Sequence, residues 1–374
     1  MKIMHLADFH LDSAFSGFKK DAADKKRQEM RECFVRAMKL AKEREVKLIL
    51  IPGDLFDTPF CSAITRKTVF DAMAEVGCPV VIAPGNHDYY NKNGTYADKN
   101  LPENVFVFNS TELGRFDFDE LHISVVGYAF TSDRYEENPL SGEVPTSDEN
   151  VNILCAHTEL SVPLSKYAPM SENAIAKHGF TYAALGHVHA KQDPIALDNT
   201  LIAYSGFAQG RSFDELNAGG AYIVDIDLET KKAALERVKL SSMSYVIERI
   251  DITALTSDED VAKKIISVIE DKKYDEEIAL RIVLCGAIPS DYSVNESAIR
   301  NQLASFKLAL LQIRNESVAS FDLAELAKDM TVRGEVYRTL LPLLNSDNEN
   351  ERQKGALALK FALAALDKRE FGVD

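Results

Sequence analysis

The feature that most limits how this chain can fold is a series of short apolar runs, each closed by turn residues. Runs of this length and composition are typical of buried strands. Between the first two runs, apolar residues from Met30 to Ala41 recur at steps of three and four, which predicts a helix with one face on a sheet. The first third of the chain is therefore predicted to run β-α-β-α-β. The predicted strands are Ile3–Ala7, Leu48–Pro52, Val80–Pro84, Val105–Phe108, Ile123–Val126, Val151–Cys155, Tyr182–Leu185, Leu201–Tyr204 and Ala221–Ile226.

Strand signals dominate after Pro102, and we expect a second sheet packed on the first as far as about Leu240, with a helical break around Ser171–Lys177. A smaller α+β unit is predicted to begin at Tyr245. From Phe321 onward, helix signals occur without strand signals. The expected domains are residues 1–240, 241–315 and 316–374. The smaller unit is predicted to contain strand Tyr245–Ile250, helix Asp258–Ile269, strand Ile278–Leu284 and helix Glu296–Leu311.

The last helical segment, Gly355–Leu366, is apolar on nearly every face, and it follows a polar turn at Asn345–Asn350. A surface helix normally carries a polar face, so this segment must be covered. Packing on the preceding helices and docking to the coiled coil of a partner both remain open.

Side chains that bind metals follow five of the predicted strands. Loops at the carboxyl ends of neighbouring strands converge on one edge of a sheet, so we expect these side chains to form one site. Imidazoles favour Zn, Mn or Fe over Mg or Ca. Five of the eight histidines fall in these motifs, whereas His5, His122 and His178 lie in or beside ordinary elements. The motifs are Asp8-Phe9-His10, Gly53-Asp54-Leu55-Phe56-Asp57, Gly85-Asn86-His87-Asp88, His157, and Gly186-His187-Val188-His189.

Each residue has an ordinary structural interpretation when it is taken alone. A single histidine such as His10 or His157 is more often a satisfied core or surface residue, and Asp8 or Asp54 could make local turn hydrogen bonds. The joint occurrence of the five motifs at strand ends favours a metal site.

Composition excludes several classes of protein. Hydrophobic residues make up 46% and charged residues 27%, which excludes a disordered chain and a membrane-spanning one. The net charge of −15 lacks the basic field of most nucleic-acid-binding proteins, so a polyanion must be held locally. Five scattered cysteines without a C-x-x-C pair indicate reduced thiols. Because Asp8 interrupts the first apolar stretch, we expect no signal peptide and a cytoplasmic location without membrane contact.

The order D-x-H, G-D-x-x-D, G-N-H-D, H, G-H-x-H resembles the calcineurin-like metallophosphoesterase superfamily over roughly residues 1–240. Within it, Ala7–Ser13, Gly53–Asp57 and Tyr204–Arg211 with Glu215 resemble the DNA-repair exonuclease branch, which contains bacterial SbcD, the YhaO-type proteins and the Mre-eleven nuclease. The resemblance implies an α/β fold, a four-layer α/β/β/α sandwich, with a small α+β capping domain and a helical C-terminal tail.

The same resemblance implies roles for individual residues. His87 is expected to be a catalytic histidine that does not bind metal, oriented by Asp88. Arg211 is expected either to contact DNA or to be a surface residue paired with Asp214 or Glu215. Archaeal and eukaryotic members carry a histidine where Asp57 stands, so Asp57 has either a chemical role or, with Pro59, a turn-stabilising one. The implied ligands are Asp8, His10, Asp54 and His189 for one ion, and Asp54, Asn86, His157 and His187 for the other.

The implied function is a two-metal-dependent phosphodiester hydrolase that acts on DNA in repair, a 3′–5′ exonuclease with single-strand endonuclease activity. Its cofactors would be two divalent ions, Mn²⁺ first and Fe or Zn as alternatives. Its partners would be DNA, a second copy joined through helices near Ile64–Met73, and an SbcC-like ABC-type ATPase. A phosphodiesterase or phosphatase on small nucleotides or phosphoproteins is the alternative, and a non-catalytic scaffold subunit is the second alternative.

Overall fold

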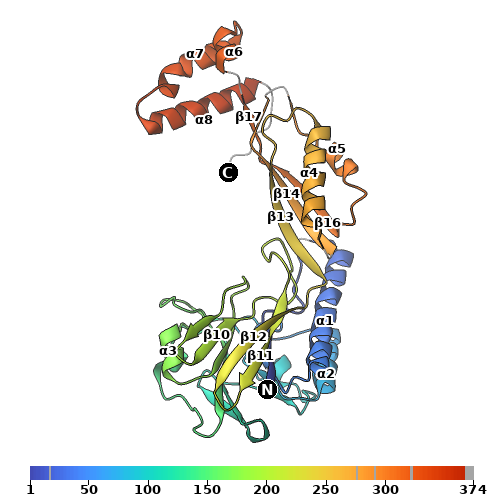
Figure 1. The fold of residues 1–374 in the computed structure, drawn as a ribbon, viewed down its shortest axis with the longest axis vertical. Coiled ribbons are helices and arrows are strands. Elements are labelled where there is room, and N and C mark those ends of the chain that lie inside the picture. The colour runs from blue at the N-terminus through green and yellow to red at the C-terminus, as the bar shows by residue number, and fades with distance from the viewer. Residues whose placement is uncertain (17, 275–276, 290–291, 321–322, 367–374) are drawn as a thin grey trace. The chain divides into compact units, whose positions relative to one another are not determined.

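The structure is a computed structural model and describes residues 1–16, 18–274, 277–289, 292–320 and 323–366 (Figure 1). Its described residues form two units. The first comprises residues 1–246 and a short segment that ends at Ala279, and the second comprises the rest of the described chain from Ile247. The three-domain division at residues 240 and 315 stays a prediction.

The first sheet of the first unit has six strands, in the order β12-β11-β1-β2-β3-β4. Strands β1 to β4 are parallel, and β11 runs antiparallel to β1. Helices α1 and α2 pack side by side and bury their apolar faces on this sheet, against residues such as Ile49 and Ile51 (Figure 1). The elements are β1 (Lys2–His5), α1 (Lys20–Glu43), β2 (Leu48–Ile51), α2 (Ala63–Val76), β3 (Val80–Ile82), β4 (Val105–Val107), β11 (Gly220–Asp227) and β12 (Lys232–Lys239).

The second sheet also has six strands, in the order β5-β6-β7-β8-β10-β9. Leu48 and Leu50 of the first sheet share a buried cluster with Ile153 and Tyr182 of the second, so the two sheets pack face to face. Helix α3 packs on the outer face through Ile175. The layers are therefore helix, sheet, sheet and helix, which confirms the predicted sandwich. The elements are β5 (Gly114–Phe118), β6 (Ile123–Gly127), β7 (Val151–His157), α3 (Glu172–Lys177), β8 (Tyr182–Gly186), β9 (Ile195–Leu197) and β10 (Thr200–Tyr204).

A three-stranded sheet in the order β13-β14-β16 lies mainly in the second unit, which also contains helices between and after these strands. The predicted helix Glu296–Leu311 is wrong beyond Gln302, where α5 ends, because Leu310–Asn315 is the strand β16 beside β14. Sheet pairing satisfies the backbone groups that a continued helix would have satisfied internally. The elements are β13 (Met243–Asp251), α4 (Asp258–Lys272), β14 (Glu277–Cys285), β15 (Ala287–Pro289), α5 (Glu296–Gln302), β16 (Leu310–Asn315), β17 (Val318–Ser320), α6 (Leu323–Lys328), α7 (Val332–Leu344) and α8 (Glu349–Leu366).

The C-terminal region is helical, although Phe321, where the prediction began, lies outside the described residues. Leu359 and Leu363 of α8 are buried with Tyr337 of α7, so this helix does pack on the preceding ones. Leu357 on α8 remains 52% exposed. Among the described residues, no helix has the length and apolar character that crossing a bilayer requires.

Candidate metal centre

The predicted ligands come from loops that leave both sheets at the same edge. Asp8 and His10 follow β1, Asp54 follows β2, and Asn86 follows β3. From the second sheet, His157 ends β7, and the loop after β8 carries the other two histidines. Because the strands before these loops are buried and hydrogen-bonded to their neighbours, the loops start from a rigid base.

Several of these residues have unusual backbone conformations. Asp8, His10 and Asp54 have φ of 52°, 46° and 51°, and His187 has φ of 107°. Positive φ is uncommon for residues with a side chain, and such strain concentrates at functional sites. Gly53, with φ of 90°, precedes Asp54, and a β-carbon at position 53 would come within 2.3 Å of Nδ1 of His157. The chain therefore bends sharply where the two sheets meet.

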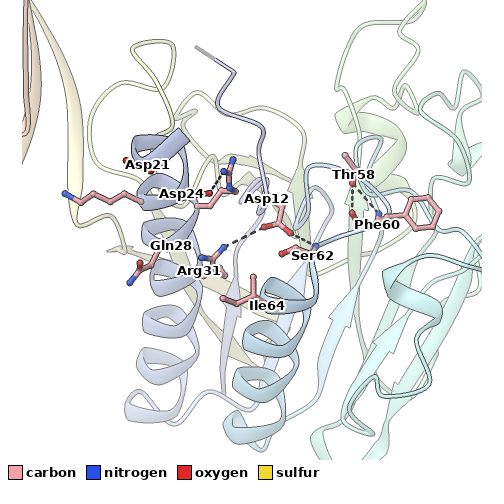
Figure 2. A pocket seen from close by; sticks show the side chains of 11 residues that line it. Asp12, Asp21, Asp24, Gln28, Arg31, Thr58, Phe60, Ser62 and Ile64 are labelled. Atoms are coloured by element: carbon pink, nitrogen blue, oxygen red, sulfur yellow. Dashed lines mark hydrogen bonds and ion pairs between the residues drawn. The ribbon is translucent and has the colours of Figure 1, made fainter. Parts of the chain in front are cut away.

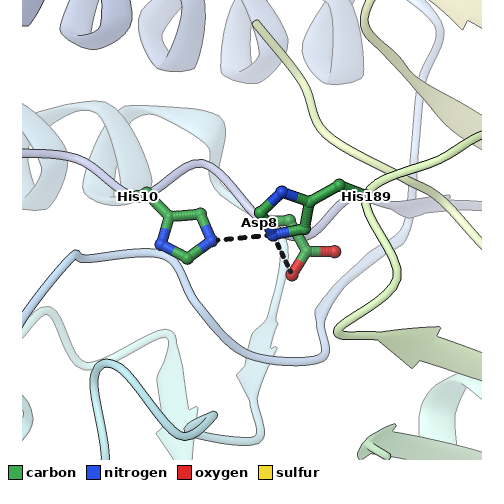
Figure 3. Close-up of side chains that lie close together, drawn as sticks. All are labelled: Asp8, His10 and His189. Atoms are coloured by element: carbon green, nitrogen blue, oxygen red, sulfur yellow. Dashed lines mark hydrogen bonds and ion pairs between the residues drawn. The ribbon is translucent and has the colours of Figure 1, made fainter. Parts of the chain in front are cut away.

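Three side chains form one ligand cluster (Figure 3). Nε2 of His10 lies 3.0 Å from Nε2 of His189, and that second nitrogen lies 3.9 Å from Oδ1 of Asp8. Asp8 and His10 are 1% exposed. Figure 3 shows the two imidazoles turned toward each other with the carboxylate beside them. The arrangement offers two nitrogen donors and one oxygen donor to a single ion.

Asp54 lies at the centre of the site. Its Oδ2 is 3.6 Å from Nε2 of His10 and 3.5 Å from Nε2 of His157, which come from different sheets. Nε2 of His157 is also 2.9 Å from the side-chain oxygen of Asn86, and its ring lies 5.1 Å from the ring of His187. The structure thus brings together all seven predicted ligands.

Burial shapes the protonation of these groups. Burial raises the pKa of Asp8 to about 6, and burial with the neighbouring Asp88 and Asp8 carboxylates raises the pKa of Asp54 well above its usual value. Burial also lowers the pKa of His10 to about 3 and that of His157 well below its usual value. Neutral imidazoles and crowded carboxylates are the donor set that divalent cations stabilise. Donor atoms of Asp8, His10 and His189, and likewise of Asp8, Asp54 and His157, lie within 4.8 Å of one another, so the residues fit metal ions.

A second layer of charged side chains supports two of the histidines. Nδ1 of His10 lies 3.2 Å from Oδ1 of Asp57, and Nδ1 of His189 lies 2.9 Å from Oε1 of Glu215. Arg211 donates to Oε1 of Glu215 at 2.5 Å and lies 3.7 Å from Asp57. Although burial opposes it, hydrogen bonds from His189 and Arg211 lower the pKa of Glu215 to about 2. The sequence motif contained Glu215, but no spacing rule indicated its contact with His189.

Arg211 therefore pairs with Glu215, one of the two partners that the surface-residue interpretation offered. Asp214, the other, instead accepts a hydrogen bond from Ser212 at 3.0 Å. Arg211 is only partly exposed and lies 3.3 Å from Nδ1 of His189. It is thus part of the support behind the ligand cluster.

The expectation that Asp88 orients His87 is wrong. The carboxylate of Asp88 accepts hydrogen bonds from the backbone N–H groups of Asp54, Phe56 and Gly85 at 2.8–3.1 Å, and from the hydroxyl of Tyr96. Asp88 is fully buried, whereas the side chain of His87 is 45% exposed. Asp88 consequently fixes the loops after β2 and β3, and no sequence signal pointed to Tyr96.

His87 lies at the accessible side of the cluster. Its ring packs edge-on against the ring of His10 at 4.6 Å, and its Nδ1 lies 3.8 Å from Oδ1 of Asp57. Its backbone N–H donates to Asp54 at 3.0 Å. The side chain of His87 is therefore held beside the donor atoms while remaining open to a ligand.

Two depressions lie near the site in the first unit. One of about 460 Å³ is lined by His189, Asp57, Arg211, Glu215 and neighbouring residues, including Phe18. Another of about 840 Å³ lies between the start of α1 and the start of α2 (Figure 2). There the carboxylate of Asp12 accepts from the backbone of Ser62 at 2.6 Å, which ties the loop after β1 to α2.

Several known proteins are similar to this chain. The metallophosphoesterase YhaO of Bacillus subtilis is 27% identical over 313 residues, which cover 77% of this chain and 72% of that protein. The SbcD component of the nuclease SbcCD from Staphylococcus epidermidis is 28% identical over 265 residues, covering 62% and 67%. The DNA double-strand break repair protein Mre11 of Aeropyrum pernix is 26% identical over 270 residues, covering 67% and 64%.

A family model matches the part of the chain that carries the ligand motifs. Residues 1–191, which include every predicted ligand from Asp8 to His189, match the model described as calcineurin-like phosphoesterase. The chain belongs to the calcineurin-like phosphoesterase family, whose members use a dinuclear metal site to hydrolyse phosphoesters.

Proposed function

We propose that this protein is a metal-dependent nuclease that hydrolyses phosphodiester bonds in DNA. The observation that carries the proposal is the position of Asp54, whose carboxylate lies within 3.6 Å of histidines from both sheets, with the exposed His87 beside it. The similarity to a component of the SbcCD nuclease and to a DNA double-strand break repair protein supports DNA as the substrate class.

Seven side chains of this chain would hold the two ions. Two bound divalent cations supply Lewis-acid catalysis, because they offset the charge of the phosphate and lower the pKa of water. We propose Mn²⁺ as the native metal, with Fe and Zn as alternatives, because the imidazole-rich donor set suits these ions. One ion would be held by Asp8, His10, Asp54 and His189, and the other by Asp54, Asn86, His157 and His187.

His87 would act on the substrate itself. It is exposed, lies beside the donor atoms, and can donate a hydrogen bond or a proton to an oxygen that gains negative charge as the ester bond breaks. The carboxylate of Asp57 lies 3.8 Å from Nδ1 of His87. Asp88 would contribute by fixing the loop that carries Asn86 and His87.

We further propose that the nuclease activity is that of a 3′–5′ exonuclease that also cleaves single strands. The net charge of −15 disfavours strong DNA binding by this chain alone, because DNA affinity comes largely from cationic contacts. We therefore propose that it works with an SbcC-like ABC-type ATPase. That partner would bind to the C-terminal region, within the described residues 316–320 and 323–366. The DNA would be capped by residues 241–315.

A second copy of the chain would bind through α2. Phe60, which precedes this helix, and Ile64, in its first turn, are 58% and 61% exposed, although both are large and apolar. Exposed apolar groups that lie close together are a common mark of an interface. Analytical ultracentrifugation of the full chain and of Ile64→Glu would test this surface, with dimer expected only for the unchanged protein.

One experiment separates the proposed function from its alternatives. The protein is incubated with Mn²⁺ and linear duplex DNA labelled at the 3′ or 5′ end, beside bis-nitrophenyl phosphate, with Asp54→Asn as a matched variant that lacks the central ligand. Cleavage of both substrates, with early release of the 3′ label, is expected. Cleavage of the small ester alone would favour a small-substrate phosphodiesterase, and cleavage of neither would favour a scaffold role; either result would overturn the proposal.

A further inference from the structure

We propose that Glu215, compensated by Arg211, is a positioning residue for the ligand His189, and that with Asp57 it makes the two metal positions unequal, so that the Asp8/His10/His189 position fills first. The inference rests on the proposed two-metal chemistry. It concerns side chains that the ligand motifs do not assign to the metals.

The first step of the argument is the tautomer of the two histidines. Glu215 presents a carboxylate oxygen 2.9 Å from Nδ1 of His189, and Asp57 presents one 3.2 Å from Nδ1 of His10. A carboxylate can only accept, so each Nδ1 carries a hydrogen and, in the neutral ring, each Nε2 keeps its lone pair.

The second step is where these lone pairs point. The two Nε2 atoms face each other at 3.0 Å, with Oδ1 of Asp8 3.9 Å from that of His189. Two lone pairs and a carboxylate held this close would repel one another, and a cation between them, either a shared proton or a metal ion, removes the repulsion. Glu215 and Asp57 thus hold the donor atoms in the binding arrangement before an ion arrives.

The third step is how the negative charge of Glu215 is itself compensated. Glu215 is 4% exposed, and a buried carboxylate is costly unless its charge is compensated. Arg211 compensates it through Nε at 2.9 Å, Nη2 at 2.5 Å and its own backbone N–H at 2.8 Å. The same guanidinium lies 3.7 Å from Asp57, so one cation holds both supporting carboxylates in place.

The fourth step is the contrast with the other position. Nδ1 of His157 lies 3.1 Å from the carbonyl oxygen of Pro52, a neutral acceptor. The ligand beside it, Asn86, is neutral too, whereas Asp8 is charged when it binds a cation. The negative charge of Glu159 favours the protonated form of His187 from a distance, but the Glu159 carboxylate itself accepts a hydrogen bond from the hydroxyl of Ser165. Carboxylates behind ligating histidines raise the basicity of the ring, so the supported position binds its ion more tightly.

The test is a titration of the metal-free full chain with Mn²⁺, in which electron paramagnetic resonance counts the free ion. Two binding steps of unequal affinity are expected. Glu215→Gln keeps the shape of the side chain and removes its charge, and it should weaken the tighter step by ~10- to 100-fold while leaving the other within about twofold. Asn86→Ala should remove the weaker step alone.

Asp214→Asn is the matched control, because Asp214 is an exposed acid of the same loop that bonds to Ser212. It should bind both ions as the unchanged protein does. Thermal denaturation of each variant in chelator reports folding, and Glu215→Gln should unfold within a few degrees of the unchanged protein.

Three results would overturn the inference: unchanged Mn²⁺ binding in Glu215→Gln, equal weakening of both steps, or loss of the tighter step in Asn86→Ala. Absence of Mn²⁺ binding by the unchanged protein would instead refute the proposed function. Because no DNA enters the titration, a protein that binds two ions but cleaves no DNA would leave the inference standing and the nuclease proposal refuted.

Discussion

The backbone of Gly186 lies against the carbonyl group of Pro52, so close that a β-carbon at position 186 would be 1.9 Å from the carbonyl oxygen. This contact joins the end of β8 in the second sheet to the end of β2 in the first. The same oxygen accepts a hydrogen bond from Nδ1 of His157. The metal ligands of the two sheets can approach one another only because residue 186 has no side chain.

Gly186→Ala should therefore destabilise the fold by about 1–3 kcal/mol, the usual result of forcing an extra methyl group into a packed region. Urea denaturation of the metal-free protein measures this free energy. Gly142→Ala is the matched control, because a β-carbon there would meet nothing within 4 Å, and it should change stability by less than about 0.5 kcal/mol. Equal stability of the two variants would contradict the packing argument.

His87→Ala should bind two ions and lose most of its turnover, by ~10²- to 10⁴-fold, because the side chain is placed to act as a proton or hydrogen-bond donor and is not one of the proposed ligands. Elemental analysis after desalting and hydrolysis of bis-nitrophenyl phosphate measure the two quantities. His178→Ala, a change at the end of α3 away from the ligands, should retain full activity. Loss of one metal ion from the His87 variant would show that His87 is a ligand.

Tyr96→Phe should lower the free energy of unfolding by about 1–3 kcal/mol, because it removes one of the four donors to the fully buried carboxylate of Asp88. Chemical denaturation checks the value. Tyr274→Phe removes a hydroxyl that bonds to Glu248 near the surface, and it should cost less. The prediction fails if the surface change is the more harmful of the two.

His5 should make the fold sensitive to mild acid. It is fully buried between Tyr182 and the carbonyl of Leu185, and burial lowers its pKa from 6.5 to about 3. Since the unfolded chain protonates this histidine at a higher pH than the folded one, the stabilisation is complete above pH 6.5 and is lost as the pH falls from 6.5 toward 3.

At pH 5 the loss from His5 should be about 2 kcal/mol. Urea denaturation in chelator, at pH 7 and pH 5, should show a smaller drop for His5→Gln than for the unchanged protein. Identical drops would mean that His5 titrates normally in the folded state.

Removal of metal should lower the melting temperature, because an ion that binds only the folded chain stabilises it in proportion to the logarithm of its concentration. At a Mn²⁺ concentration of about 100 times the dissociation constant, each site should contribute about 2.7 kcal/mol. Scanning calorimetry with Mn²⁺ and with chelator measures the shift. Asp54→Asn, without the shared ligand, should show a much smaller dependence on Mn²⁺.

The sequence was informative wherever a buried apolar run ended in a polar residue. Leu48–Ile51 is buried throughout, and its hydrophobic signal sufficed to place Asp54 at the end of a strand. In contrast, β12 has two charged residues between Leu235 and Val238 and carries no comparable run. The start of β16 was predicted as helix, because its pairing with β14 is not visible in the sequence.

The supporting contacts were beyond the reach of the sequence. Glu215 is 26 residues from His189 and lies in a loop without regular structure, so no period relates the two positions. The partner of Asp88 was predicted to be its neighbour His87, yet the chain turns so that Asp88 faces inward and His87 faces out. Such contacts depend on side-chain direction, which strand patterns do not specify in loops.

The order in which the ligands occur along the chain has a consequence for biosynthesis. Asp8 and His10 are made first, but the histidine that completes their cluster is residue 189, and the carboxylate behind it is residue 215. A nascent chain that ends before residue 189 therefore lacks the second nitrogen donor of this cluster, although it already carries Asp8 and His10. The cluster of Asp8, His10 and His189 can therefore be completed only after residue 189 has been synthesised, so its donor atoms cannot hold an ion together early in translation.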